Sequence, residues 1–177
     1  MDITKIEKDG FYISSKSIDL AINSRSEKAD VVLMPSRAQS PAGSKPILFD
    51  SAGEYEVKSC MIDAIPLAKG ICGFSVFIDK MRVAYISDIT TTLTDQQLEA
   101  FASVDILIVP AVGEKSEITT KIINQIEPSI VIPHNYTAEQ LKVLSAEFGS
   151  EQETLQKFKI TKKELLETEQ QRLIVLK

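Results

Sequence analysis

Short runs of alternating or continuous apolar residues dominate the first ninety positions of the chain. Charged residues, glycine or small polar residues separate them, which is the pattern of β-strands joined by turns. The pattern predicts no helix before residue 90. It predicts strands over residues 10–15, 17–22, 29–34, 46–50, 55–66, 71–79 and 81–87, the last two joined by a tight hairpin turn at Asp79 and Lys80.

Beyond residue 90 the apolar spacing changes to that of helices alternating with buried strands. Capping boxes at Thr94 and Thr137, and a serine cap at Ser116, predict helices over about 94–103, 137–148 and 116–125. Continuous apolar strands are expected over 104–109 and 129–132, each closed by a proline, with two more at 157–160 and 172–176. An antiparallel, strand-rich first half is therefore followed by β-α-β-α units, whose parallel strands must be covered by helices.

Composition and charge narrow the function classes. The 177 residues suit one domain, 1–177. A domain of this length can bury a stable core without disulfides or a structural metal. The net charge of −5 and the scattered lysines and arginines argue against nucleic-acid binding. The start carries charges and no apolar signal region, and apolar runs fall short of about 20 residues, so we expect a cytoplasmic protein with no membrane span. Cys60 and Cys72 are expected to be buried free thiols.

Several strings, found in order along the chain, resemble those of one protein family. The string G-E-Y-E-V-K at 53–58 is followed by Ile86-Ser87-Asp88 and by L-T-D-Q-Q-L at 93–98. Further along stand V-D-I-L-I-V-P at 104–110 and I-E-P-S-I-V-I-P-H-N-Y at 126–136. Together they are similar to the metallo-β-lactamase fold superfamily, in its small branch of Zn-dependent hydrolases related to ascorbate-6-phosphate lactonase.

The resemblance implies an αββα sandwich, the metallo-β-lactamase fold, and a binuclear zinc centre held by histidines and aspartates. Such a centre needs about three or four protein ligands for each metal. The family's H-x-H-x-D-H motif is absent, and its ligand positions carry mostly other residues. They fall on Ser36, Ala38, Ser40, Pro41, Lys69, Asp88 and Asn135. Only Asp88 matches, and the loop 36–45 is too short for the helix that follows the motif in full-length relatives.

His134, the only histidine, stands one residue before the family's last ligand position. On a strand end this offset places its side chain on the other face, although a one-residue slip in the loop would restore it. Asp88 could be a relic ligand, a general base or the cap of the turn that follows. Arg37 and Lys69 are expected at the rim of the former metal site, where they either bind an anion or neutralise Asp88.

The leading hypothesis is a metal-free, catalytically degenerate member of the fold, acting as a binding, scaffolding or oligomer-forming module for a protein or small-molecule ligand. The alternative is a metal-dependent hydrolase of the lactonase or phosphoester type, with Zn²⁺, Mn²⁺ or Mg²⁺ at an atypical site around Asp88 and His134. Asp50 or Glu54 would complete that site. A third hypothesis is a small-anion sensor that uses Arg37 and Lys69. Glu54, Tyr55 and Glu56 are interpreted as structural, with Tyr55 packed against the fold.

Overall fold

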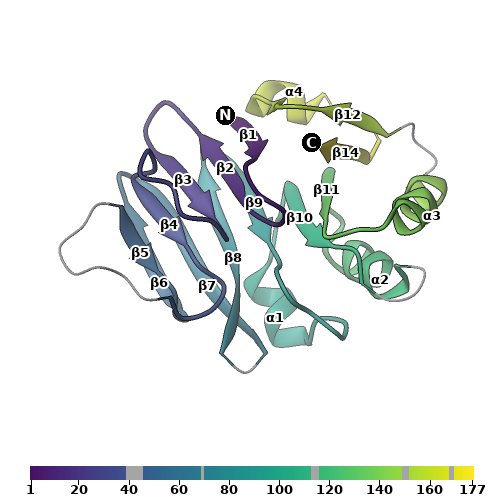
Figure 1. Cartoon of the computed structure of the whole chain (residues 1–177), viewed down its shortest axis with the longest axis horizontal. Helices are drawn as coiled ribbons and strands as arrows, with labels where there is room; N and C mark the ends of the chain where they lie inside the picture. Colours follow the sequence, from purple (N-terminus) through teal and green to yellow (C-terminus); the bar gives the residue numbers. More distant parts are fainter. Residues whose placement is uncertain (39–45, 69, 113–115, 149–151, 168–169) are drawn as a thin grey trace.

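The computed structural model describes residues 1–38, 46–68, 70–112, 116–148, 152–167 and 170–177. Two β-sheets pack face to face, and helices lie on one side of the pair (Figure 1). Strand-rich character up to residue 93 and the alternation of strands and helices after it agree with the prediction from the sequence. Among the described residues, none of the helices is long and apolar enough to cross a membrane.

The first sheet contains six strands in the order β13-β1-β2-β3-β4-β5. Their bounds are β1 Asp2–Lys5, β2 Phe11–Ser14, β3 Asp19–Ile22, β4 Val31–Leu33, β5 Ile47–Phe49 and β13 Phe158–Lys159. The pairs from β13 to β3 are antiparallel, but β3–β4 and β4–β5 are parallel. The prediction of an antiparallel first half is therefore wrong for β4 and β5, because the chain crosses over before each of them instead of turning back.

The second sheet contains eight strands in the order β12-β14-β11-β10-β9-β8-β7-β6. Their bounds are β6 Gly53–Val57, β7 Cys60–Ala68, β8 Ile71–Ile78, β9 Met81–Tyr85, β10 Ile106–Pro110, β11 Ile130–His134, β12 Glu153–Leu155 and β14 Arg172–Leu176. Hairpins join β6 to β9, whereas β9, β10, β11, β14 and β12 run parallel. The predicted parallel β-α-β-α half is thus confirmed, and β10 and β11 are buried along their whole length.

The helices are α1 Asp95–Ala100, α2 Glu117–Ile126, α3 Ala138–Phe148 and α4 Lys162–Leu166. The first three contact β7, β10 and β14 of the second sheet. One apolar core, with Phe11, Leu33, Phe74 and Tyr85, fills the space between the sheets, and a second core lies between the second sheet and α1 to α3. In the described part of the chain no helix lies on the outer face of the first sheet, as Figure 1 shows.

Several boundaries differ from the prediction. Residues 55–66 form not one strand but the hairpin β6–β7, because Lys58 and Ser59 adopt left-handed conformations and turn the chain. Ser116 precedes α2 with a φ of 58° and makes no side-chain cap; Thr119 instead accepts from the Val112 N–H at 2.7 Å. The predicted turn at Asp79 and the capping box at Thr94 are confirmed.

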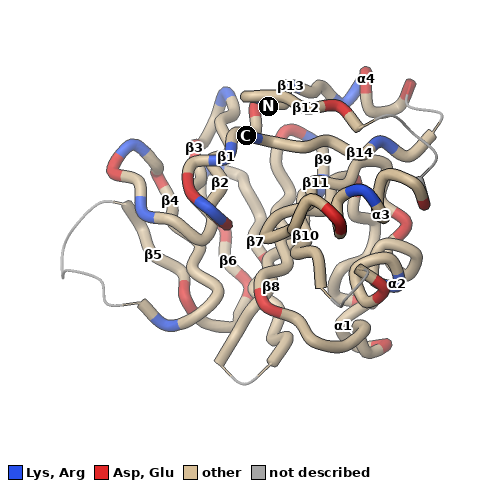
Figure 2. The backbone as a smooth tube through the Cα atoms, turned by 45° about the vertical axis from the view of Figure 1, so that its right-hand side comes forward, with Lys and Arg blue, Asp and Glu red and all other residues tan. Residues whose placement is uncertain are grey.

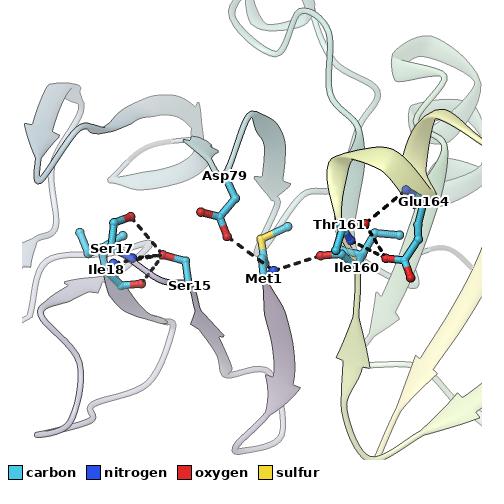
Figure 3. A network of polar contacts seen from close by, with 8 residues as sticks. All are labelled: Met1, Ser15, Ser17, Ile18, Asp79, Ile160, Thr161 and Glu164. Atoms are coloured by element: carbon cyan, nitrogen blue, oxygen red, sulfur yellow. Dashed lines mark hydrogen bonds and ion pairs between the residues drawn. The ribbon is translucent and has the colours of Figure 1, made fainter.

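The strand β1 and the helix α4 were not predicted, and local contacts explain both. Thr161 and Glu164 form a reciprocal capping box that starts α4, visible in Figure 3. The ammonium group of Met1, at the start of β1, lies between two elements that are distant in sequence (Figure 3). It donates to the carbonyl oxygen of Ile160 at 3.0 Å and lies 3.5 Å from the Asp79 carboxylate. These contacts link the edge of the first sheet to the β8–β9 turn.

Candidate functional site

A polar pocket of about 300 Å³ opens where the ends of β4, β9 and β11 meet the turn between β1 and β2. Three of its residues, Ser36, Asp88 and Asn135, are those that the resemblance assigns to the family's metal-ligand positions. The ends of neighbouring strands meet at one edge of the fold, so residues far apart in sequence come together there. The pocket is lined by Asp9, Asn23, Pro35, Ser36, Ile71, Tyr85, Ser87, Asp88, His134 and Asn135.

The segment after β4 is attached to the second sheet. Ser36 forms an isolated antiparallel bridge with Ile71, and the Cys72 N–H donates to the carbonyl oxygen of Pro35 at 2.7 Å. Further on, the backbone N–H of Ala38 donates to the Asp50 carboxylate at 2.9 Å. Serine and alanine at these two ligand positions offer no imidazole or carboxylate to a metal.

Part of the predicted site cannot be placed. Ser40, Pro41 and Lys69 lie outside the residues that the structure describes. Arg37 is exposed and lines a neighbouring pocket of about 510 Å³ together with Asp50. The pairing of Arg37 with Lys69 around an anion therefore stays a prediction.

Asp88 follows β9 and lines the polar pocket with an exposed side chain. The two other carboxylates considered for an atypical metal site lie elsewhere. Asp50 belongs to the neighbouring pocket, and Glu54 lines a third one with Asp63 beside α1. The structure therefore does not gather Asp50 and Glu54 around Asp88 and His134.

His134, the last residue of β11, is 2% exposed. Its Nε2 atom lies 2.9 Å from the carbonyl oxygen of Ile86, and because a carbonyl only accepts, Nε2 carries a proton and donates. Its Nδ1 atom lies 3.6 Å from the Asp9 carboxylate and has no hydrogen-bond partner. The next residue, Asn135, has a φ of 49° and is exposed at the pocket. Of the two neighbours, His134 is thus buried and Asn135 is exposed, and both line the same pocket.

Sequence reasoning missed the residues that hold His134 in place. Tyr85, at the end of β9, stacks on the imidazole with ring centroids 5.3 Å apart, and Phe11 contacts it edge-on at 5.8 Å. The Tyr85 hydroxyl donates to the carbonyl oxygen of Asp9 at 3.0 Å, and the Asn23 amide also donates to it, at 3.3 Å. An Asp-Gly pair signals a turn at residues 9 and 10, but no local signal links that turn to His134.

Burial lowers the pKa of His134 below its usual value of 6.5, since a charged imidazole would lose its hydration. The Ile86 carbonyl and the Asp9 carboxylate favour the charged form and oppose this shift, while Lys5 adds to it. Burial also raises the pKa of the neighbouring Tyr85 phenol, which therefore stays neutral. His134 is accordingly a neutral imidazole at neutral pH, with a proton on Nε2 and a bare Nδ1.

The lowered pKa predicts a pH dependence of stability. Below about pH 6.5 the unfolded chain binds a proton at His134 that the folded chain does not, so the free energy of unfolding falls as the pH falls. Urea denaturation between about pH 7 and pH 5 measures this slope. In His134→Gln this part of the slope is absent. An identical slope in the variant and the parent protein would contradict the assignment.

The described residues do not fit the binuclear metal centre that the fold implies. They contain no group of three His, Cys, Asp or Glu side chains placed to hold a metal ion. Cys60 and Cys72 are buried free thiols, as predicted. Burial raises the pKa of Cys60 to about 11 and also raises that of Cys72, so both are neutral thiols at neutral pH. Neither cysteine lines the polar pocket, so they do not replace the histidines that the family uses as ligands there.

The string at 53–58 has the structural role that the sequence predicted. Tyr55 stacks on Phe49 with ring centroids 4.0 Å apart, and its hydroxyl donates to the carbonyl oxygen of Ser51 at 2.9 Å. This contact joins β6 to β5 and hence the edges of the two sheets.

In the described part of the chain, positive and negative residues are scattered over both sheets and the helices, as Figure 2 shows.

The comparisons with known proteins agree on the fold. The profile of the β-lactamase superfamily domain matches residues 2–135. A protein from Thermotoga maritima, provisionally assigned as a Zn-dependent hydrolase of the metallo-β-lactamase superfamily, has a TM-score of 0.82 at 18% identity, covering 99% of this chain and 97% of that one. The metallo-β-lactamase fold protein YhfI from Bacillus subtilis has a TM-score of 0.64 at 10% identity, covering 95% and 88%.

A metallo hydrolase from the archaeon Ignicoccus hospitalis, Igni18, has a TM-score of 0.59 at 15% identity, covering 82% of this chain and 91% of that one. No curated protein matches the chain in sequence. Since these structures are distant in sequence, the likeness establishes the metallo-β-lactamase fold and not a shared activity.

Proposed function

The chain belongs to the β-lactamase superfamily, and within it we propose that this protein is a metal-free binding module that has lost the superfamily's hydrolytic centre. It uses the pocket at the strand ends to hold a ligand and not to cleave a substrate. This pocket lies where the family carries its metal ions, but in this protein we propose that it binds a ligand without a metal.

The orientation of His134 carries this proposal. Its Nε2 proton is donated to the Ile86 carbonyl, its Nδ1 lies 3.6 Å from the Asp9 carboxylate, and Tyr85 stacks on the ring, so both nitrogens are engaged with protein groups other than Asp88. A zinc ligand must present a bare nitrogen to the metal while its other nitrogen donates to a second group. His134 meets this requirement at Nδ1, but only the Asp9 carboxylate lies beside that nitrogen, and the described residues place no third donor there. The exposed residue that takes the ligand position is Asn135, whose amide is a poor zinc donor.

The same orientation argues against His134 as a general base. A base must reach the proton that it abstracts with an unprotonated nitrogen. Nε2 already carries a proton, and burial lowers the pKa of the ring, so Nδ1 is a weaker base than a free imidazole. Loss of catalysis therefore follows from the placement of the ring as well as from the residues at the ligand positions.

A metal-dependent hydrolase remains the second candidate, because Igni18 is a metallo hydrolase and the Thermotoga maritima protein is provisionally assigned as one. In this chain it would have to use Asp88 and His134 at an atypical site. The two residues line one pocket, which is the observation in favour of it. Asp9 lines the same pocket, but these three side chains are not placed to hold one ion, so further ligands would have to come from residues outside the described ranges.

Elemental analysis of the purified protein separates these two candidates. After soaking in Zn²⁺, Mn²⁺ or Mg²⁺ and desalting, we expect far less than one metal ion per chain, since two donors do not form a tight site. About one ion or more per chain would overturn the metal-free proposal. Asp88→Ala is the matched variant: loss of a bound metal on this substitution would place the ion in the polar pocket.

A further inference from the structure

The residues that line the pocket carry buried polar atoms without a hydrogen-bond partner. Three of the six buried side-chain atoms without a hydrogen-bond partner in the described part of the chain belong to residues that line it: Asp9 Oδ1, Ser87 Oγ and His134 Nδ1. Leaving a buried polar atom without a partner is energetically costly, so such atoms are rare unless a bound group satisfies them. Their gathering in one pocket indicates a ligand.

Two of these atoms, His134 Nδ1 and Asp9 Oδ1, lie next to each other and require a donor that the described part of the chain does not supply. His134 Nδ1 is a bare lone pair, because the proton of the neutral ring lies on Nε2. The Asp9 carboxylate, 3.6 Å away, also only accepts when ionised. The backbone of Asp9 is anchored beside His134, because its carbonyl oxygen accepts from the Tyr85 hydroxyl and the Asn23 amide. Two acceptors are therefore held side by side with no proton between them.

The charge of the pocket selects a cationic donor. Asp9 and Asp88 both line it, and no lysine or arginine is among its described lining residues. Lys5, which acts electrostatically on His134, instead lies over the ring of Tyr136, with its Nζ atom 5.6 Å from the centroid. A neutral donor such as water would satisfy the two atoms but not the charge of the carboxylates. A group that carries a positive charge and several N–H bonds satisfies both.

We infer that this pocket binds a small ligand through a primary ammonium group, which donates to His134 Nδ1 and Asp9 Oδ1. The inference rests on the proposed function, since it names the ligand class of the same metal-free site. A pocket of about 300 Å³ is at the small end of ligand sites, which favours a short amine. Asp88 at the rim adds a second negative charge to attract it, and Ser87 Oγ offers a further polar contact.

Calorimetric titration with methylammonium chloride tests the inference at constant ionic strength. Tetramethylammonium chloride, with the same charge and no N–H bond, is the control ligand. We expect saturable binding of methylammonium and none of tetramethylammonium. Equal binding of both, or no saturable binding of methylammonium up to about 100 mM, would overturn the ammonium site.

Asp9→Asn is the decisive variant. The new amide can donate to His134 Nδ1, so the variant fills the missing hydrogen bond and removes the charge together. We expect methylammonium to bind at least about tenfold more weakly, as for loss of a charge-assisted hydrogen bond, while the urea midpoint stays equal or rises. Glu56→Gln removes one negative charge from exposed β6, away from the pocket, and is expected to bind as the parent protein does.

The outcomes keep this inference apart from the proposed function. Unchanged affinity in Asp9→Asn, with the fold intact, would overturn the ammonium site alone. One tightly held Zn²⁺ per chain, displacing methylammonium, would overturn the metal-free function as well. Absence of both metal and methylammonium binding would remove the ammonium site and leave the metal-free function in place.

Discussion

Replacing Tyr85 with alanine is expected to lower the free energy of unfolding by about 3 to 5 kcal/mol, the usual cost of removing a buried aromatic side chain. Tyr85 is fully buried between the sheets and packs against both Phe11 and His134. Tyr85→Phe keeps the ring and loses only the hydrogen bond to the Asp9 carbonyl, so we expect a loss of about 0.5 to 1.5 kcal/mol. Urea denaturation monitored by circular dichroism measures both values.

Tyr12→Ala is the matched control for this experiment. Tyr12 lies on β2 next to Phe11, but it is only partly buried, and its hydroxyl donates to the carbonyl oxygen of Lys28 at 3.2 Å. We expect its loss to cost about 1 kcal/mol, as at partly exposed positions. Similar losses for Tyr85→Ala and Tyr12→Ala would contradict the assignment of Tyr85 to the core between the sheets.

Gly10→Ala is expected to destabilise the protein by about 1 to 3 kcal/mol through overpacking. A Cβ atom at Gly10 would lie 2.6 Å from the Cβ of Ser24, closer than such atoms approach in proteins. Because Gly10 directly follows Asp9, the displacement also moves the Asp9 carboxylate relative to His134. The free energy of unfolding and the affinity for methylammonium are both expected to fall.

The clash can be relieved from its other side. Ser24→Gly removes the Cβ atom that the new methyl group would meet, so Gly10→Ala/Ser24→Gly is expected to be more stable than the sum of the single changes predicts. A double-mutant cycle in urea measures this coupling. Strict additivity would show that the cost of Gly10→Ala arises from the turn itself and not from contact with Ser24.

Local patterns predicted most elements of the fold because each carries its own signal. The apolar runs of β10 and β11 indicate parallel strands covered on both faces, and Thr94 indicates the start of α1. The hairpin at Lys58 and Ser59 was missed because neither residue is typical of a left-handed turn. The helix α4 was missed although Thr161 and Glu164 have the spacing of a capping box, because the helix that begins there is only five residues long.

The candidate site was predictable only in part. The family strings place Ser36, Asp88 and Asn135 at strand ends, and the structure brings these three together in one pocket. Asp9 and Tyr85 could not be predicted there, since their contacts with His134 join segments more than forty residues apart and depend on how the two sheets pack. Long-range packing, which a single sequence does not show, decides which way the ring of His134 faces.

The metal-free account depends most directly on the two nitrogens of His134. Because the chain has one histidine, a long-range proton–nitrogen NMR correlation spectrum reports this ring alone. At neutral pH we expect a protonated Nε2 and an unprotonated Nδ1, with neither signal changing when equimolar Zn²⁺ is added. A proton on both nitrogens would pair the ring with Asp9 and remove the need for a ligand. Loss of the Nε2 proton, or a shift of either nitrogen on adding Zn²⁺, would contradict the metal-free site.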